Sequence, residues 1–92
     1  MSGQMPSDIR LKDNVRFLRR VGSYNFYSFS YLNNPTKYVG VMAQEIINQN
    51  PEAITVDKNG NYLVNYSMLG IKMYTLDEWN DLVNIRNINP IF

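Results

Sequence analysis

The chain has 92 residues, a formal net charge of +1, and neither cysteine nor histidine. That length suits one domain at most and buries only about 60–65% of the unfolded surface, so an assembly partner would be a natural source of stability. The composition excludes disulfides, cysteine nucleophiles, the usual zinc ligands and a Ser-His-Asp triad, gives no argument for nucleic acid, and offers no apolar run long enough for a membrane span.

Residues 1–6 are small and polar, and they are interpreted as a leader or a remnant of an upstream passenger. The domain itself is expected over residues 7–92. Its pattern predicts a small α+β fold with short strands, a hairpin and two to three short helices.

Ser7 and Lys12 are the first residues that could carry chemistry. A serine becomes a nucleophile when a base removes its proton, and a lysine can be that base if burial or nearby positive charge keeps it neutral. Four arginines between positions 10 and 20 could supply such charge. An offset of five puts the two side chains on opposite faces of a strand and off the three-four spacing of a helix. A working dyad therefore needs a bend between them, or a lysine from another subunit.

Residues 13–22 are predicted to form a short amphipathic helix that ends at Gly22. The apolar positions with helical spacing are Val15, Phe17, Leu18 and Val21. The arginines of this stretch, Arg16, Arg19 and Arg20, are interpreted as a solvated polar side.

Residues 25–32 alternate and are rich in aromatic side chains, which favours a strand. These aromatics could form a stacking platform for bases or sugars, but packing in the core or at a subunit interface is the favoured interpretation. Residues 33–36 predict a turn, and residues 38–41 a second short strand.

Residues 42–48 predict a helix that Pro51 ends, and Gln44 and Glu45 lie on it. A glutamine amide can donate to a developing oxyanion, and a glutamate can orient a lysine. A plain polar pair on a helix surface is the alternative, and both interpretations stay open.

Residues 54–56 and 62–64 flank Asn59-Gly60, which is typical of a tight hairpin turn. Asp57-x-Asn59-x-Asn61 superficially resembles a calcium loop, but the other ligands of such a loop are missing, so a metal site is rejected. Residues 65–69 predict one helical turn before Gly70.

Thr75 and Glu78 predict a capping box that opens a last helix, which Pro90 stops. Its stripe at three-four spacing consists of Leu76, Trp79, Leu82, Val83 and Arg86. This stripe could be a subunit interface or part of the core within one chain.

Three blocks of this sequence share the pattern of one family. They are Ser7-Asp8-Ile9-Arg10-Leu11-Lys12-Asp13-Asn14-Val15, then Gly40-Val41-Met42-Ala43-Gln44-Glu45-Ile46 with Pro51-Glu52-Ala53-Ile54, then Gly60-Asn61-Tyr62-Leu63-Val64-Asn65-Tyr66-Ser67-Met68-Leu69. Over about residues 7–69 the chain resembles the intramolecular chaperone auto-processing domain. That domain lies at the C-terminus of phage tailspikes, tail fibres and endosialidases, and in a membrane-bound transcription factor of the myelin regulatory type.

The resemblance implies that Ser7 and Lys12 are a catalytic dyad that cuts the chain at the Pro6-Ser7 bond. The activity implied is that of a self-cleaving serine endopeptidase acting once, in cis, without a cofactor or metal. Asp8, Gln44 and Glu45 are candidates for support of the dyad.

The family also implies a homotrimer and an upstream passenger of the same precursor as partners, with no role for nucleic acid or membrane. The expected location is the bacterial host cytoplasm during phage assembly, or the virion tail if the domain is not released. Family members commonly continue into a longer C-terminal helix, whereas this chain ends in the tail 87–92.

Two other functions stay open. One is a trimerisation cap that never cuts, which Pro6 favours because its ring restricts how the scissile carbonyl is presented. The other is a glycan-binding module at a fibre tip, with Tyr27 and Tyr31 among the aromatic residues that would contact the receptor.

Overall fold

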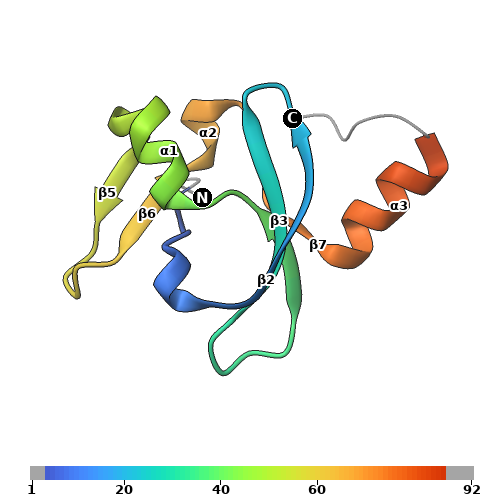
Figure 1. Cartoon of the computed structure of the whole chain (residues 1–92), viewed down its shortest axis with the longest axis horizontal. Helices are drawn as coiled ribbons and strands as arrows, with labels where there is room; N and C mark the ends of the chain where they lie inside the picture. Colours follow the sequence, from blue (N-terminus) through green and yellow to red (C-terminus); the bar gives the residue numbers. More distant parts are fainter. Residues whose placement is uncertain (1–3, 87–92) are drawn as a thin grey trace.

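The computed structural model describes residues 4–86, which form two antiparallel sheets and three α-helices (Figure 1). The four-stranded sheet contains, in spatial order, β2 (Lys12–Val21), β3 (Tyr24–Tyr31), β4 (Lys37–Gly40) and β7 (Tyr74–Thr75). The three-stranded sheet contains β1 (Gln4–Pro6), β6 (Tyr62–Asn65) and β5 (Ile54–Val56). The predicted α+β class is confirmed.

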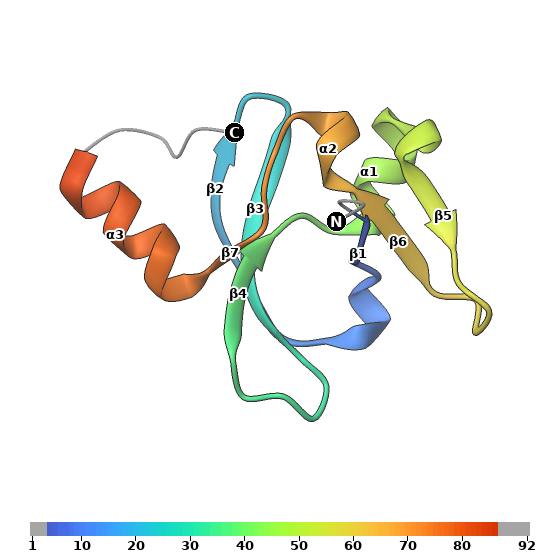
Figure 2. The ribbon, with the colours of Figure 1, turned by 180° about the vertical axis from the view of Figure 1, so that it is seen from behind.

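The helices lie at opposite ends of the molecule. They are α1 (Ala43–Gln49), α2 (Tyr66–Leu69) and α3 (Leu76–Arg86), and short 3-10 turns cover Ile9–Leu11 and Pro51–Ala53. Both α1 and α2 lie beside the three-stranded sheet, while α3 lies beyond β7 at the far side of the four-stranded sheet (Figures 1 and 2).

The core joins the two sheets and all three helices. Its fully buried members include Phe26, Val39, Val41, Ile46 and Val64. Trp79 of α3 stacks on Phe26 with ring centroids 5.4 Å apart, and is itself only 5% exposed. Of the two interpretations of the α3 stripe, Trp79 therefore supports the core within one chain.

The helix predicted over residues 13–22 is wrong, because this segment is strand β2. Its pairing with β3 has register shifts between Asp13 and Arg16 and again between Phe17 and Arg19. Side chains of a strand normally alternate between its two faces, and the extra residue of a bulge shifts this alternation by one position. Two residues that face the core can then be three positions apart instead of two. Leu18 and Val21 both reach the core in this way, and their spacing imitates that of a helix.

The other predicted elements are found close to their expected bounds. The aromatic strand is β3, the helix at residues 42–48 is α1 shifted by one residue, and residues 54–64 form the hairpin β5–β6. Gly60 in the hairpin loop and Gly70 after α2 have φ angles of +83° and +69°, the left-handed region that glycine adopts readily. The predicted helix stop at Pro90 and the tail 87–92 lie outside the described residues, as do residues 1–3 of the predicted leader. Within residues 4–86 no helix is long and apolar enough to cross a membrane.

The capping box of α3 generates a first prediction. The Glu78 amide donates to Thr75 Oγ1 at 3.1 Å, and the Thr75 amide donates to Glu78 Oε1 at 2.8 Å. We expect Thr75→Ala to lower the free energy of unfolding by about 1 kcal/mol, because a helix amide loses its acceptor. Urea denaturation would measure the loss, with Thr75→Ser as the control that retains the hydroxyl. Equal stability of the alanine variant and the wild type would show that this cap contributes nothing.

Candidate active site

The segment between Ser7 and Lys12 bends, as expected if the two residues act within one chain. Strand β1 ends at Pro6, the 3-10 turn occupies Ile9–Leu11, and β2 begins at Lys12. The Leu11 amide closes this turn by donating to the Asp8 carbonyl at 3.0 Å. As a result both side chains point into the protein, with Ser7 0% and Lys12 7% exposed.

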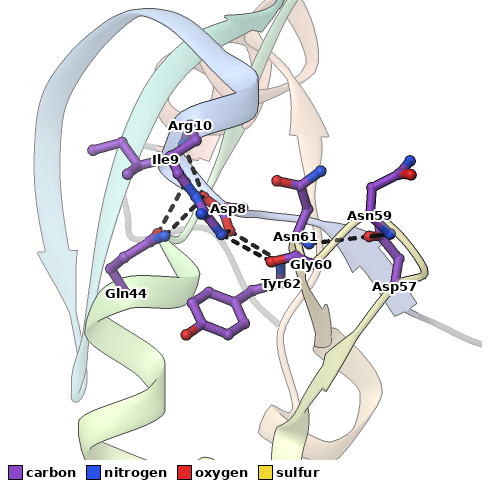
Figure 3. A network of polar contacts seen from close by, with 9 residues as sticks. All are labelled: Asp8, Ile9, Arg10, Gln44, Asp57, Asn59, Gly60, Asn61 and Tyr62. Atoms are coloured by element: carbon purple, nitrogen blue, oxygen red, sulfur yellow. Dashed lines mark hydrogen bonds and ion pairs between the residues drawn. The ribbon is translucent and has the colours of Figure 1, made fainter.

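Asp8 holds the bend together (Figure 3). Its carboxylate accepts bonds from the Arg10 amide and guanidinium, from the Tyr62 amide at 3.0 Å, and from Gln44 Nε2 at 2.8 Å. The carboxylate is fully buried, although the Arg10 side chain is 60% exposed. Hydrogen bonding by Arg10 is the main cause that holds the pKa of Asp8 well below its usual range, against the opposing effect of burial.

Gln44 and Arg10 extend this network to α1 and to the hairpin loop (Figure 3). Gln44 Oε1 accepts from the Ile9 amide at 2.9 Å, so both ends of its amide bind the bend. Arg10 Nη2 donates to the Gly60 carbonyl at 2.9 Å. Within that loop, the Asp57 carboxylate accepts from backbone amides at 2.8 and 3.0 Å, which explains the calcium-like spacing as turn chemistry.

Backbone and side chain both fix Ser7. Its amide donates to the Tyr62 carbonyl at 3.2 Å, and its carbonyl accepts from the Ala43 amide at 2.9 Å. Its Oγ bonds to Tyr66 Oη at 3.4 Å. Burial raises the pKa of Tyr66 to about 12, so this phenol stays neutral beside the serine. Gly40 leaves room for it, because a Cβ at position 40 would overlap the Tyr66 hydroxyl.

Lys12 lies in an apolar environment. Its Nζ donates to the Val41 carbonyl at 2.9 Å, contacts Met42 Sδ at 3.8 Å, and lies 3.9 Å from the centroid of the Phe29 ring. Burial lowers the pKa of Lys12 to about 7, while the charge of Asp8 acts in the opposite direction. A substantial share of this amine is therefore neutral near pH 7. Burial, rather than the nearby arginines considered from the sequence, is the cause.

Contacts from both Ser7 and Lys12 lead to Val41, the residue that follows strand β4. The Val41 carbonyl binds Lys12 Nζ, and the Val41 amide donates to Tyr66 Oη at 2.9 Å, which in turn bonds Ser7. No direct hydrogen bond joins Ser7 and Lys12 in the described part of the chain. Glu45 lies apart from this group and accepts from Tyr27 Oη at 2.7 Å.

Two tyrosines contact this site that the sequence did not predict to lie beside Ser7 and Pro6. Tyr66 contacts Ser7, and Tyr31 Oη donates to the Pro6 carbonyl oxygen at 2.6 Å. Tyr66 falls inside the third block of the family pattern, which was its only signal. Tyr31 was considered only as an aromatic residue that could contact a glycan, and its position on an alternating strand gave no signal of a contact with Pro6.

Comparison with known proteins gives one match. A family model described as "Chaperone of endosialidase", whose family name denotes a peptidase, matches residues 7–55, more than half of the chain. No curated protein and no solved structure matches the chain. The matched residues include the bend, β2 to β4 and α1.

The Asp8 network generates a second prediction. We expect Asp8→Asn to lower the free energy of unfolding at pH 7 by about 2–4 kcal/mol, because an amide places donors where Arg10, Gln44 and a backbone amide already donate. Asp8 has a depressed folded pKa, so its contribution is present above the usual carboxyl pKa and is lost as pH falls through the folded value.

The measurement is urea denaturation of the wild type and Asp8→Asn at pH 7 and under acidic conditions. Asp13→Asn, at an exposed carboxylate of β2, is the matched control. A stability difference that is small at pH 7, or that does not shrink in acid, would contradict the role of Asp8.

Burial of Lys12 generates a third prediction. Between the folded pKa of about 7 and the ordinary lysine value of 10.5, the unfolded chain binds one more proton than the folded chain. The wild type should therefore gain stability relative to Lys12→Met as pH rises through this window, by up to about 1.4 kcal/mol per pH unit. Below about pH 7 the difference should be constant.

Urea denaturation between about pH 6 and 10 would measure this trend. Lys37→Met, at an exposed lysine of β4, is the control that removes a positive charge from the surface. The interpretation of Lys12 fails if both variants follow the same pH dependence.

Proposed function

The chain belongs to the chaperone-of-endosialidase family, and from this premise we propose that it is the self-releasing chaperone of a phage fibre or spike protein. It would promote folding and trimerisation of an upstream passenger and then cut its own chain at Pro6-Ser7. The observation that carries the proposal is a buried lysine with a pKa of about 7, in the same bent segment as a buried serine.

In the proposed reaction, Lys12 Nζ takes the proton of Ser7 Oγ, and Oγ forms a bond to the carbonyl carbon of Pro6. The tetrahedral intermediate collapses as the carbon–nitrogen bond breaks. Lys12 returns the proton to the departing nitrogen of Ser7, which leaves Pro6 esterified to Oγ and a free amine on Ser7. Water then hydrolyses this ester, giving a carboxylate on Pro6 and restoring the serine hydroxyl.

The substrate needs no binding pocket, because the scissile bond is part of the same chain. Strand β1 pairs with β6 through Met5 opposite Val64 and Pro6 opposite Leu63. This pairing presents the Pro6 carbonyl at the edge of the three-stranded sheet. Pro6 is exposed, so water would have access from its side once the ester has formed.

A homotrimer is the proposed assembly, formed in the bacterial host cytoplasm during phage assembly. Support comes from the surface of β2, an edge strand of its sheet, where Phe17 is 56% and Val15 37% exposed. Apolar side chains on an open strand edge favour contact with another chain. A domain that is not released would remain on the virion tail.

A cap that trimerises without cutting is the second candidate. It is favoured by one observation, since Ser7 Oγ bonds to Tyr66 and not directly to Lys12. The glycan-binding alternative has less support, because the hydroxyls of Tyr27 and Tyr31 are already engaged by Glu45 and the Pro6 carbonyl.

Cleavage of the full chain generates a fourth prediction. We expect intact mass spectrometry of the purified wild type to show a product that begins at Ser7, and Ser7→Ala and Lys12→Ala to remain whole. The rate should rise with pH through about 7, because only neutral Lys12 can accept the serine proton. Lys37→Ala is the matched control and should cut at the wild-type rate.

Sedimentation of the same samples would report the assembly state. Trimers in all variants, with cleavage only in the wild type and the Lys37 control, would establish the self-releasing chaperone. A wild type that trimerises and stays whole would leave the permanent cap and remove the catalytic claim.

A further inference from the structure

We propose that Tyr31 is a catalytic residue, whose hydroxyl stabilises the oxyanion that forms on the Pro6 carbonyl during cleavage. This inference rests on the proposed self-cleavage. Tyr31 Oη donates to the Pro6 carbonyl oxygen at 2.6 Å, and this oxygen belongs to the carbonyl that Ser7 would attack. A donor already aimed at the atom where negative charge develops is the usual means of stabilising such a transition state.

The sheet register puts this donor beside the proposed base. Lys12 of β2 pairs directly with Tyr31 of β3, and directly paired residues of antiparallel strands share one face of the sheet. Phe29, two positions along β3, lies under Lys12 Nζ on that same face. One strand pair therefore supplies the base, its apolar surroundings and the oxyanion donor.

Neighbouring rings hold Tyr31 in place. Its ring contacts Phe29 edge-on with centroids 5.3 Å apart, and lies 5.5 Å from the ring of Tyr38. A second acceptor, Met73 Sδ, lies 3.7 Å from its hydroxyl. Burial raises the pKa of Tyr31, so the hydroxyl keeps its proton and remains a donor at neutral pH.

Two other candidate donors, the Gln44 side chain and the Ser7 amide, donate to other acceptors. Gln44 Nε2 donates to Asp8, whose own carboxylate is ionised and can only accept. The Ser7 amide donates to the Tyr62 carbonyl. Tyr31 is therefore the group that the described contacts place on the Pro6 oxygen.

Tyr31 would act twice as a hydrogen-bond donor, without giving up its proton. As Ser7 Oγ bonds to the Pro6 carbon, the carbonyl π electrons move to oxygen, and the Tyr31 O–H···O bond shortens onto that charge. When the bond to the Ser7 nitrogen breaks, its electron pair leaves with nitrogen, and the charge on oxygen is lost as the carbonyl π bond re-forms. The same donor serves again when water adds to the ester and Oγ departs.

The test compares cleavage rates of the wild type, Tyr31→Phe and Tyr38→Phe in the full chain, followed by intact mass. Tyr31→Phe keeps the ring and its packing, and should slow cleavage about 10²- to 10³-fold. Tyr38→Phe removes a hydroxyl from the same aromatic group and should cut at the wild-type rate. The midpoint of the pH profile should stay near 7 in both, because Lys12 sets it.

Each outcome has one meaning once circular dichroism and urea unfolding have confirmed that the variants fold. A wild-type rate for Tyr31→Phe would overturn the role of Tyr31 and leave the self-releasing chaperone intact. A rate loss shared with Tyr38→Phe, or a shifted pH midpoint, would also overturn it, since that pattern reports damaged packing. A wild type that never cuts would remove the proposed function and this inference with it.

Discussion

The buried carboxylate of Asp8 is the group on which the geometry of this region depends. A fully buried charge is costly unless it is hydrogen-bonded, and here the donors come from three separate parts of the chain: Arg10 of the bend, Gln44 of α1, and the Tyr62 amide at the start of β6. Because each donor satisfies the same carboxylate, the bend, the helix and the hairpin cannot move independently without leaving it unpaired. Ser7 is the residue directly before Asp8 in the chain, so its position is fixed by the same network.

The environment of the Lys12 amine is a second constraint, and it differs from that of the Asp8 carboxylate. Where Asp8 is surrounded by donors, the Lys12 amine has one carbonyl, one sulfur and one aromatic face as neighbours. Asp8 therefore stays charged on burial, whereas Lys12 loses much of its charge near pH 7. Groups whose environments push their pKa values apart mark acid–base chemistry. Asp8 is adjacent to Ser7, and Lys12 lies five positions from it. The contrast between their two environments is the electrostatic basis of the proposed reaction.

The sequence predicted local features better than long-range ones. The offset between Ser7 and Lys12 predicted a bend for a dyad within one chain, and Thr75 and Glu78 predicted the α3 cap, because both features depend on residues close in the chain. Strand β2 was predicted as a helix because a bulge lets Leu18 and Val21, three positions apart in the sequence, both face the core. Those bulges also set the register that pairs Lys12 with Tyr31, so the contact of Tyr31 with Pro6 could not be read from spacing. The candidate roles of Gln44 depended in the same way on where α1 lies relative to the bend.

Burial of the reacting groups suggests how the proposed cleavage would be timed. An enzyme that acts on many substrates needs an open cleft, whereas Ser7 is completely enclosed and its target is the bond preceding it. Lys12 is buried by strand β3, and Pro6 meets Tyr31 only when β1 has added to the edge of β6. In an unfolded chain the lysine would be protonated and the carbonyl would have no fixed donor. The proposed reaction could therefore start only after both sheets have formed, and folding itself would then be the step that activates the serine.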